Sequence, residues 1–186
     1  LKCEGDPLVT PPRVRPAVAD WGGTGELDLI TLDLQGVLCV YPRTGPYEVG
    51  EPRPLVDRLG RLIRLDGAFR QAGRCALWAG PWTGPGHLDL LVGLPRSNRH
   101  VIPALTGRPL ENVDDLPTVL LLEHLGEDVL VPRPVFLTDG RPLVVGSEGC
   151  SPCGVPWTDP RALELDLLVG ADDGRGLAFR RDDLRW

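Results

Sequence analysis

The chain carries Trp82-Thr-Gly-Pro-Gly-His-Leu-Asp89-Leu-Leu-Val-Gly93 near its middle and repeats this phrase on either side. The other copies are Trp21-Gly-Gly-Thr-Gly-Glu-Leu-Asp28-Leu-Ile and Trp157-Thr-Asp-Pro-Arg-Ala-Leu-Glu-Leu-Asp166-Leu-Leu-Val-Gly170. Each copy is a tryptophan, a turn containing Gly or Pro, and an aspartate that opens an aliphatic run. The three aspartates are 61 and 77 positions apart, which is too long for a helical solenoid and typical of a unit of several strands. The sequence therefore predicts an all-β protein built from three related units.

Short aliphatic and β-branched runs between Gly and Asp turns predict the strands of these units. Two of the runs, 54–65 and 118–124, also fit a helix by their leucine spacing. The first is interpreted as an outer strand because Gly60 interrupts it, and the second as a strand because of its β-branched start and its place in the repeat. The expected strands are 15–19, 28–33, 37–41, 54–65, 74–78, 87–93, 100–105, 118–124, 129–131, 142–146, 165–170 and 177–179.

These strands are expected to form about three four-stranded antiparallel sheets within a single domain, in units of about 14–66, 72–131 and 132–186. Short strands, glycine hairpins and a long repeat are typical of β-propeller blades, and a β-sandwich is the alternative. Because three blades are fewer than the four to eight that close a propeller, the sequence predicts an open arc of a larger propeller. The uncovered sheet of such an arc predicts a partner, in the first place the missing blades or the remainder of the same polypeptide.

Composition narrows the class of partner. The chain is 42% hydrophobic but has no apolar run of membrane length, which predicts that it does not insert into a membrane. Its formal net charge is −6, and it has no cluster of basic residues beyond Arg180-Arg181, which argues against nucleic acid as a partner. A glycan or another protein is favoured.

Two stretches carry a resemblance to a known family. Pro16-Ala-Val-Ala-Asp20-Trp21 through Gly25-Glu-Leu-Asp28-Leu, followed by Gly36-Val-Leu-Cys-Val-Tyr41, resembles the VCBS/FG-GAP-like repeat family. The ending Asp166-Leu-Leu-Val-Gly170-Ala-Asp-Asp-Gly174, with an aromatic at Phe179, resembles the closing blade of secreted bacterial propellers of that family.

The resemblance implies a secreted or cell-surface β-propeller, often attached to carbohydrate-active or surface proteins. The function that it implies is a non-catalytic scaffold or binding module of an exported bacterial protein, contacting glycan or protein. The alternative is a fragment of a propeller-based carbohydrate-active enzyme, a polysaccharide lyase or hydrolase. A third interpretation, an integrin-like adhesion module, would need intact calcium loops, which this chain lacks.

The family's turn often reads Asp-x-Asp-x-Asp-Gly-x-x-Asp, which gathers the several oxygen ligands that calcium requires. The first loop keeps Asp20, Thr24 and Asp28 but has Gly22 where the second acid belongs, so these three are the candidate calcium ligands. In the competing reading, each aspartate caps its turn by accepting backbone N–H bonds and each tryptophan packs between blades. The structural repeat positions are then Trp21, Asp28, Trp82, Asp89, Trp157 and Asp166, and no other cofactor is expected.

The five cysteines are Cys3, Cys39, Cys75, Cys150 and Cys153, and the odd number leaves at least one thiol unpaired within the chain. Cys150-Ser-Pro-Cys153 is a candidate loop disulfide; it also has the spacing of half a zinc site or of a redox motif, but no second Cys-x-x-Cys or His pair completes one. Cys39 and Cys75 lie in apolar runs and are predicted core residues.

Candidates for catalysis are His87, His100 and His124, with Glu123 and Glu148. Glu123-His124 is the one adjacent acid and histidine pair, and the sequence has neither a Gly-x-Ser-x-Gly elbow nor a phosphate loop. The sequence therefore assigns no catalytic residue and leans against an enzyme. An enzyme would require an acidic or basic pair beside a groove lined by exposed Trp or Tyr.

Overall fold

The computed structural model describes residues 1–65, 74–96, 101–107 and 116–186. The architecture is all-β, as the repeat predicts, with one short α-helix, α1 (Val101–Thr106), and one 3-10 turn, η1 (Arg181–Asp183). No helix in the described ranges has the length and apolar character needed to cross a membrane. The strands are β1 (Lys2–Cys3), β2 (Asp6–Pro7), β3 (Ala17–Ala19), β4 (Asp28–Leu32), β5 (Leu38–Tyr41), β6 (Arg43–Gly45), β7 (Glu48–Val49), β8 (Arg53–Pro54), β9 (Val56–Asp57), β10 (Ala76–Gly80), β11 (Asp89–Leu94), β12 (Thr118–His124), β13 (Val129–Pro134), β14 (Phe136–Leu137), β15 (Cys150–Val155), β16 (Asp166–Ala171), β17 (Gly176–Phe179) and β18 (Leu184–Arg185).

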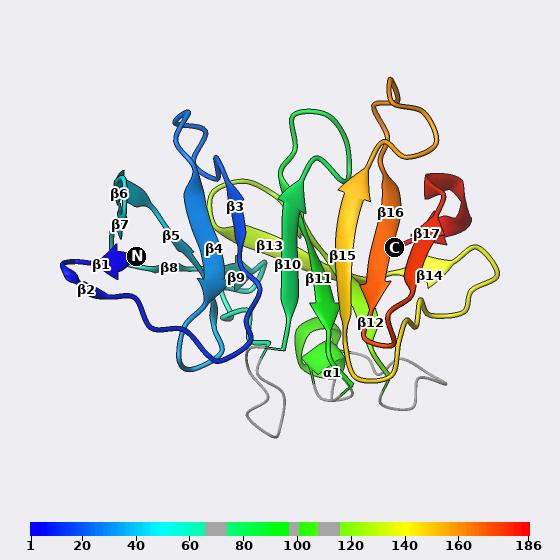
Figure 1. Cartoon of the computed structure of the whole chain (residues 1–186), viewed down its shortest axis with the longest axis horizontal. Helices are drawn as coiled ribbons and strands as arrows, with labels where there is room; N and C mark the ends of the chain where they lie inside the picture. The colour runs from blue at the N-terminus through cyan, green and yellow to red at the C-terminus, as the bar shows by residue number, and fades with distance from the viewer. Residues whose placement is uncertain (66–73, 97–100, 108–115) are drawn as a thin grey trace.

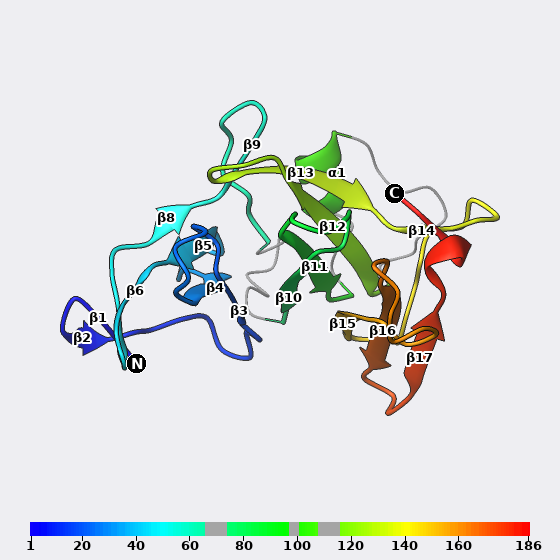
Figure 2. The same cartoon turned by 90° about the horizontal axis from the view of Figure 1, so that it is seen from above.

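Three main sheets follow one another along the chain (Figure 1). The first sheet has the order β3-β4-β5-β8, the second β10-β11-β12-β13-β9 and the third β15-β16-β17. Seen from above, their inner strands β3, β10 and β15 gather together while the later strands of each sheet point away in different directions (Figure 2). Of these three sheets, only the first has the expected four strands: the second has five, because β9 joins it, and the third has three.

Hairpins link consecutive sheets. After the outer strand of the first sheet the chain folds back so that Ile63 donates its amide to the carbonyl of Leu55, and after the second sheet Leu143 donates to Val135 in the same way. The first hairpin contains β9, which pairs in parallel with β13 of the second sheet. The second contains β14, which pairs with β18 at the chain end. The strand expected over 54–65 is therefore present as short segments that bridge two sheets.

The core lies between the sheets. Along β11, Leu90 and Val92 pack toward the first sheet, while Leu91 belongs to the cluster shared with the third sheet. Because successive side chains of a strand alternate in direction, a strand between two sheets must be apolar throughout, which explains the aliphatic run after Asp89. Burial of each such leucine stabilises the fold by about 1.5–3 kcal/mol.

The second and third sheets approach each other closely at glycines. A Cβ at Gly93 would collide with the carbonyl oxygen of Cys150 on β15, and a Cβ at Gly154 would lie 2.6 Å from the Trp78 ring. The outer face of the first sheet is covered differently. Cys3 and Leu8 of the N-terminal segment pack there against a cluster that includes Cys39 and Tyr41.

The strand expected over 100–105 is wrong in its described part, which is helix α1 (Val101–Thr106). Pro103 lies in the first turn, where its missing N–H is not needed, and the buried Val101, Ile102 and Leu105 recur at helical spacing. Gly107 ends the helix at φ +75° and donates its amide to the carbonyl of Pro103. The 118–124 run is strand β12, as predicted, and it takes the third place in the second sheet that was expected for 100–105.

The candidate disulfide between Cys150 and Cys153 is also wrong, because this segment is strand β15 rather than a loop. Residues three apart in a strand face opposite sides, with Cα atoms about 10 Å apart, beyond the roughly 7 Å that a disulfide spans. No disulfide is present in the described ranges, which include all five cysteines. Pro152 is tolerated because β15 is an inner edge strand that pairs with β16 alone. Cys39 and Cys75 are buried, which confirms them as core residues.

Candidate functional site

The aspartate of the repeated phrase joins two parts of its own sheet. Asp89 opens β11 and its side chain is fully buried. Its Oδ2 accepts hydrogen bonds from the amide and the hydroxyl of Thr83, both at 2.7 Å. Its Oδ1 accepts the amide of His124, at the end of β12, at 3.0 Å. One carboxylate therefore ties the turn before the second strand to the end of the third.

The first and third sheets make the same pair of contacts. Asp28 accepts the amides of Gly22 at 3.3 Å and Arg43 at 3.2 Å. Asp166 accepts the amides of Thr158 at 2.7 Å and Arg181 at 3.0 Å. In each sheet the first donor directly follows the tryptophan of the phrase. The reading of the repeat aspartates as caps of their turns agrees with these contacts.

The second donor in each sheet stands at or just after the end of the third strand, and we call these three positions the exit residues: Arg43, His124 and Arg181. No motif of the sequence marks them as a set. They follow their aspartates by 15, 35 and 15 positions, so the middle unit, which contains α1, carries twenty additional residues. The equal spacing in the outer units is the signal by which they could have been found.

Two of the exit residues, His124 and Arg181, also make contacts between sheets. The Trp21 ring of the first sheet stacks on His124 of the second, with centroids 4.1 Å apart and planes inclined by 20°. The Trp21 indole also donates to Asp128, in the turn between β12 and β13, at 3.2 Å. The Trp82 ring of the second sheet lies 4.4 Å from the guanidinium carbon of Arg181. Trp21 and Trp82 thus each pack on the exit residue of the next sheet.

The third copy of the phrase departs from this pattern. Trp21 and Trp82 are 6% and 1% exposed, as predicted for residues packed between sheets, whereas Trp157 is 66% exposed. The expectation that all three tryptophans pack between sheets is therefore wrong for Trp157. The described residues contain no following sheet whose exit residue could cover it.

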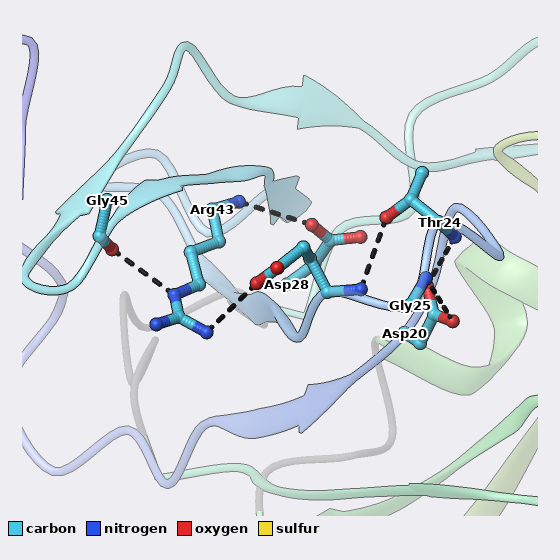
Figure 3. A network of polar contacts seen from close by, with 7 residues as sticks. Asp20, Thr24, Gly25, Asp28, Arg43 and Gly45 are labelled. Atoms are coloured by element: carbon cyan, nitrogen blue, oxygen red, sulfur yellow. Dashed lines mark hydrogen bonds and ion pairs between the residues drawn. The ribbon is translucent and has the colours of Figure 1, made fainter.

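The candidate calcium loop is filled by hydrogen bonds (Figure 3). Asp20 accepts the amides of Thr24 and Gly25 at 2.7 and 2.9 Å, one on each carboxylate oxygen. Both oxygens of Asp28 accept amides as well. Within the described ranges, no three or more His, Cys, Asp or Glu side chains converge as metal ligands would. The donor set fits a hydrogen-bonded turn rather than the oxygen shell that calcium requires.

A pocket of about 460 Å³ lies between the loops of the first and second sheets, and its lining includes Asp20, Trp21, His87, Glu123 and His124. It contains the acid and histidine pair that the sequence offered for catalysis. Glu123 is held in an ion pair with Arg133 at 2.5 Å, and Nε2 of His124 lies 2.7 Å from the carbonyl oxygen of Glu127. His124 and Trp21 cover each other. The pair is therefore engaged in contacts that hold the second sheet together.

The remaining catalytic candidates do not converge on this pocket. Glu148 lies near two arginines, Arg96 at 2.9 Å and Arg74 at 3.7 Å, and is absent from the pocket lining. His100 lies outside the described residues.

Electrostatics agree with a structural role for the repeat. Burial disfavours the charged form of Asp166, but hydrogen bonds from Thr158 and from the Arg181 amide outweigh it and hold the pKa of this carboxyl below its usual value. Burial lowers the pKa of Arg181, whose guanidinium lies between the rings of Trp82 and Trp186.

Fold and site together define an array of antiparallel sheets joined by buried aspartates and by tryptophans that pack on the neighbouring sheet. Comparison of the chain with protein-family models, with curated proteins and with solved structures finds no match.

Proposed function

We propose that this chain is a non-catalytic scaffold and binding segment of β-propeller type, carried by an exported bacterial protein and contacting protein or glycan. The contacts made by the aspartates and tryptophans of the repeated phrase support the proposal most. All three aspartates bind strands of their own sheet, and two of the three tryptophans bind the next sheet. The residues that recur along the chain therefore hold sheets together.

A propeller arrangement is the simplest account of how the sheets follow one another. Their inner strands lie together, β10 against both β3 and β15 (Figure 2). Each of the two junctions pairs a tryptophan of one sheet with the exit residue of the next. In a propeller every sheet stands in the same relation to the next, which makes such repetition necessary. The three sheets are then an arc, and the protein partner at its open end is a further set of sheets.

The rival function, a fragment of a carbohydrate-active enzyme, receives less support. Such an enzyme would need an acidic or basic pair beside a groove lined by exposed Trp or Tyr. The exposed aromatic residues Trp157 and Tyr47 are absent from the pocket between the first and second sheets, and Glu123 of that pocket already pairs with Arg133.

The two functions separate in one experiment. The chain is passed over a panel of immobilised bacterial and plant polysaccharides, and the same polysaccharides are assayed in solution for new reducing ends and unsaturated products. We expect retention without cleavage. Cleavage that is lost in Glu123→Gln would overturn the proposal in favour of the enzyme. If the chain neither binds nor cleaves any polysaccharide of the panel, these glycans are excluded and protein remains as the partner.

A further inference from the structure

One face of the third sheet has no cover among the described residues, and we call it the open face. Strand register places Cys153, Leu168 and Ala178 side by side on it, with Gly170 on the next row. Leu167 and Val169 point the other way and are buried against the second sheet. The sheet's own side chains along these rows are uncharged, and most of them are small.

The second sheet shows what such a face is built to receive. Leu91 and Gly93 stand two and four positions after Asp89, as Leu168 and Gly170 stand after Asp166. The inner strand β15 of the third sheet lies directly on Gly93, where an added Cβ would collide with the carbonyl oxygen of Cys150. At Gly170 an added Cβ would meet nothing within 4 Å. The sheet itself leaves room for a side chain at this position, but the residue is a glycine.

The tryptophans also indicate that the third sheet lacks a neighbour that the second sheet has. Trp82 stands at the edge of the second sheet and is covered by Arg181, the exit residue of the third. Trp157 has the same local structure, since its amide donates to Val155 as that of Trp82 donates to Gly80, and the next amide binds the repeat aspartate. Its ring is 66% exposed. What covers Trp82 is therefore what Trp157 lacks.

The opposite end of the array does not offer an equivalent docking surface. The outer face of the first sheet is covered by the N-terminal segment, where Cys3 and Leu8 pack near Cys39 and Tyr41. A second copy of this chain could not place its first sheet on the open face without displacing its own N-terminal segment. A sheet with an uncovered inner face is required.

We propose that the open face binds a further antiparallel sheet of the same polypeptide, lying outside residues 1–186. The carbonyl groups of its inner strand lie over Gly170, and an Arg or His exit residue lies over Trp157. This inference rests on the proposed propeller scaffold and names the partner at its open end.

The test compares the protein purified at its natural length with the polypeptide of residues 1–186, by hydroxyl-radical labelling of tryptophan read out by mass spectrometry. In residues 1–186, Trp157 is expected to react several-fold faster than Trp82. At natural length it is expected to be protected to the level of Trp82, which serves as the internal control. Equal reactivity of Trp157 in both proteins would overturn the inference. So would protection within residues 1–186 that appears only with self-association, since a second copy would then be the occupant.

A substitution within the open face tests the docking surface itself. Gly170→Leu is expected to leave the thermal midpoint of residues 1–186 nearly unchanged, because the space is open, and to lower it at natural length while exposing Trp157. An unchanged midpoint at natural length would contradict the inference. Neither result depends on glycan retention, so the failure of the glycan assay and the failure of this docking surface remain distinguishable.

Discussion

The guanidinium carbon of Arg181 lies 4.4 Å from the centroid of the Trp82 ring, although the two residues belong to consecutive sheets. The backbone amide of Arg181 binds Asp166 of its own sheet. Arg181 therefore ties the end of the third strand to the aspartate of its own sheet, and it also contacts the tryptophan of the preceding sheet. Residue His124 does the same one sheet earlier, with its amide on Asp89 and its ring on Trp21. The aspartate and the tryptophan of the repeated phrase are the residues that make these contacts with the two exit residues.

Asp89→Asn is expected to lower the free energy of unfolding by about 3 kcal/mol. The substitution removes a buried charge that accepts three hydrogen bonds and places an amide donor against N–H groups. Urea unfolding measures the change. Asp182→Asn is the control, because Asp182 is exposed and its nearest cation is 3.9 Å away, and its effect should stay within about 0.5 kcal/mol. Equal effects of the two substitutions would contradict the structural role of the repeat aspartate.

Gly93→Ala is expected to destabilise the chain by about 1–3 kcal/mol, because its methyl group would collide with the carbonyl oxygen of Cys150 and push the third sheet away. The matched variant is Gly170→Ala, which places the same methyl group in open space at the corresponding position of the third sheet. In residues 1–186 it should change the midpoint of thermal unfolding little. Similar losses from both substitutions would show that the close approach at Gly93 does not hold the sheets together.

Stability is expected to fall as the pH drops below about 4, because of carboxylates whose pKa is depressed in the folded state. Hydrogen bonds from the amide and hydroxyl of Ser147, both at 2.8 Å, hold the pKa of Asp172 well below its usual range. A depressed folded-state pKa gives stability that is present above the unfolded value, about 3.9, and is lost as the pH falls toward the folded value.

Asp172→Asn should therefore flatten the dependence of the urea midpoint on pH between about 5 and 3, where the linked proton is taken up. The variant and the parent chain should differ most at the upper end of this range and converge as the pH falls. A slope unchanged by the substitution would show that Asp172 does not contribute to the loss of stability in acid.

The thiols are expected to fall into two groups during alkylation at pH about 8. Burial raises the pKa of Cys39 and of Cys150 to about 12, so both remain protonated and inaccessible. Cys3 and Cys153 are half-buried and should react first with iodoacetamide, as followed by mass spectrometry. Modification of Cys150 at the rate of Cys153 would mean that β15 separates from the second sheet on the timescale of the reaction.

Local patterns predicted the parts of the fold that depend on neighbouring residues. The aliphatic runs after Asp28, Asp89 and Asp166 are the second strands of their sheets. Strand β11 lies between two sheets, and a strand buried on both faces must be apolar along its length. The capping role of these aspartates also followed from the turn that precedes each of them.

The features that the sequence did not predict depend on contacts between residues far apart in the chain. The exit residue His124 is 35 positions from its aspartate, and no local pattern gives that distance. The spacing of Cys150-Ser-Pro-Cys153 indicates a loop that carries a disulfide, whereas this segment is strand β15, whose extended form is set by pairing with β16. The cover of a tryptophan comes from another sheet: Arg181 lies on Trp82, and the described residues hold no equivalent contact for Trp157.

Amide hydrogen exchange at the six donors that bind the repeat aspartates tests the central claim most directly. The three loop donors and three exit donors belong to Gly22, Thr83, Thr158, Arg43, His124 and Arg181. Protection is expected at all six, with loss at Thr83 and His124 alone in Asp89→Asn. Exchange at unprotected rates at these amides, while the neighbouring strands stay protected, would contradict the account.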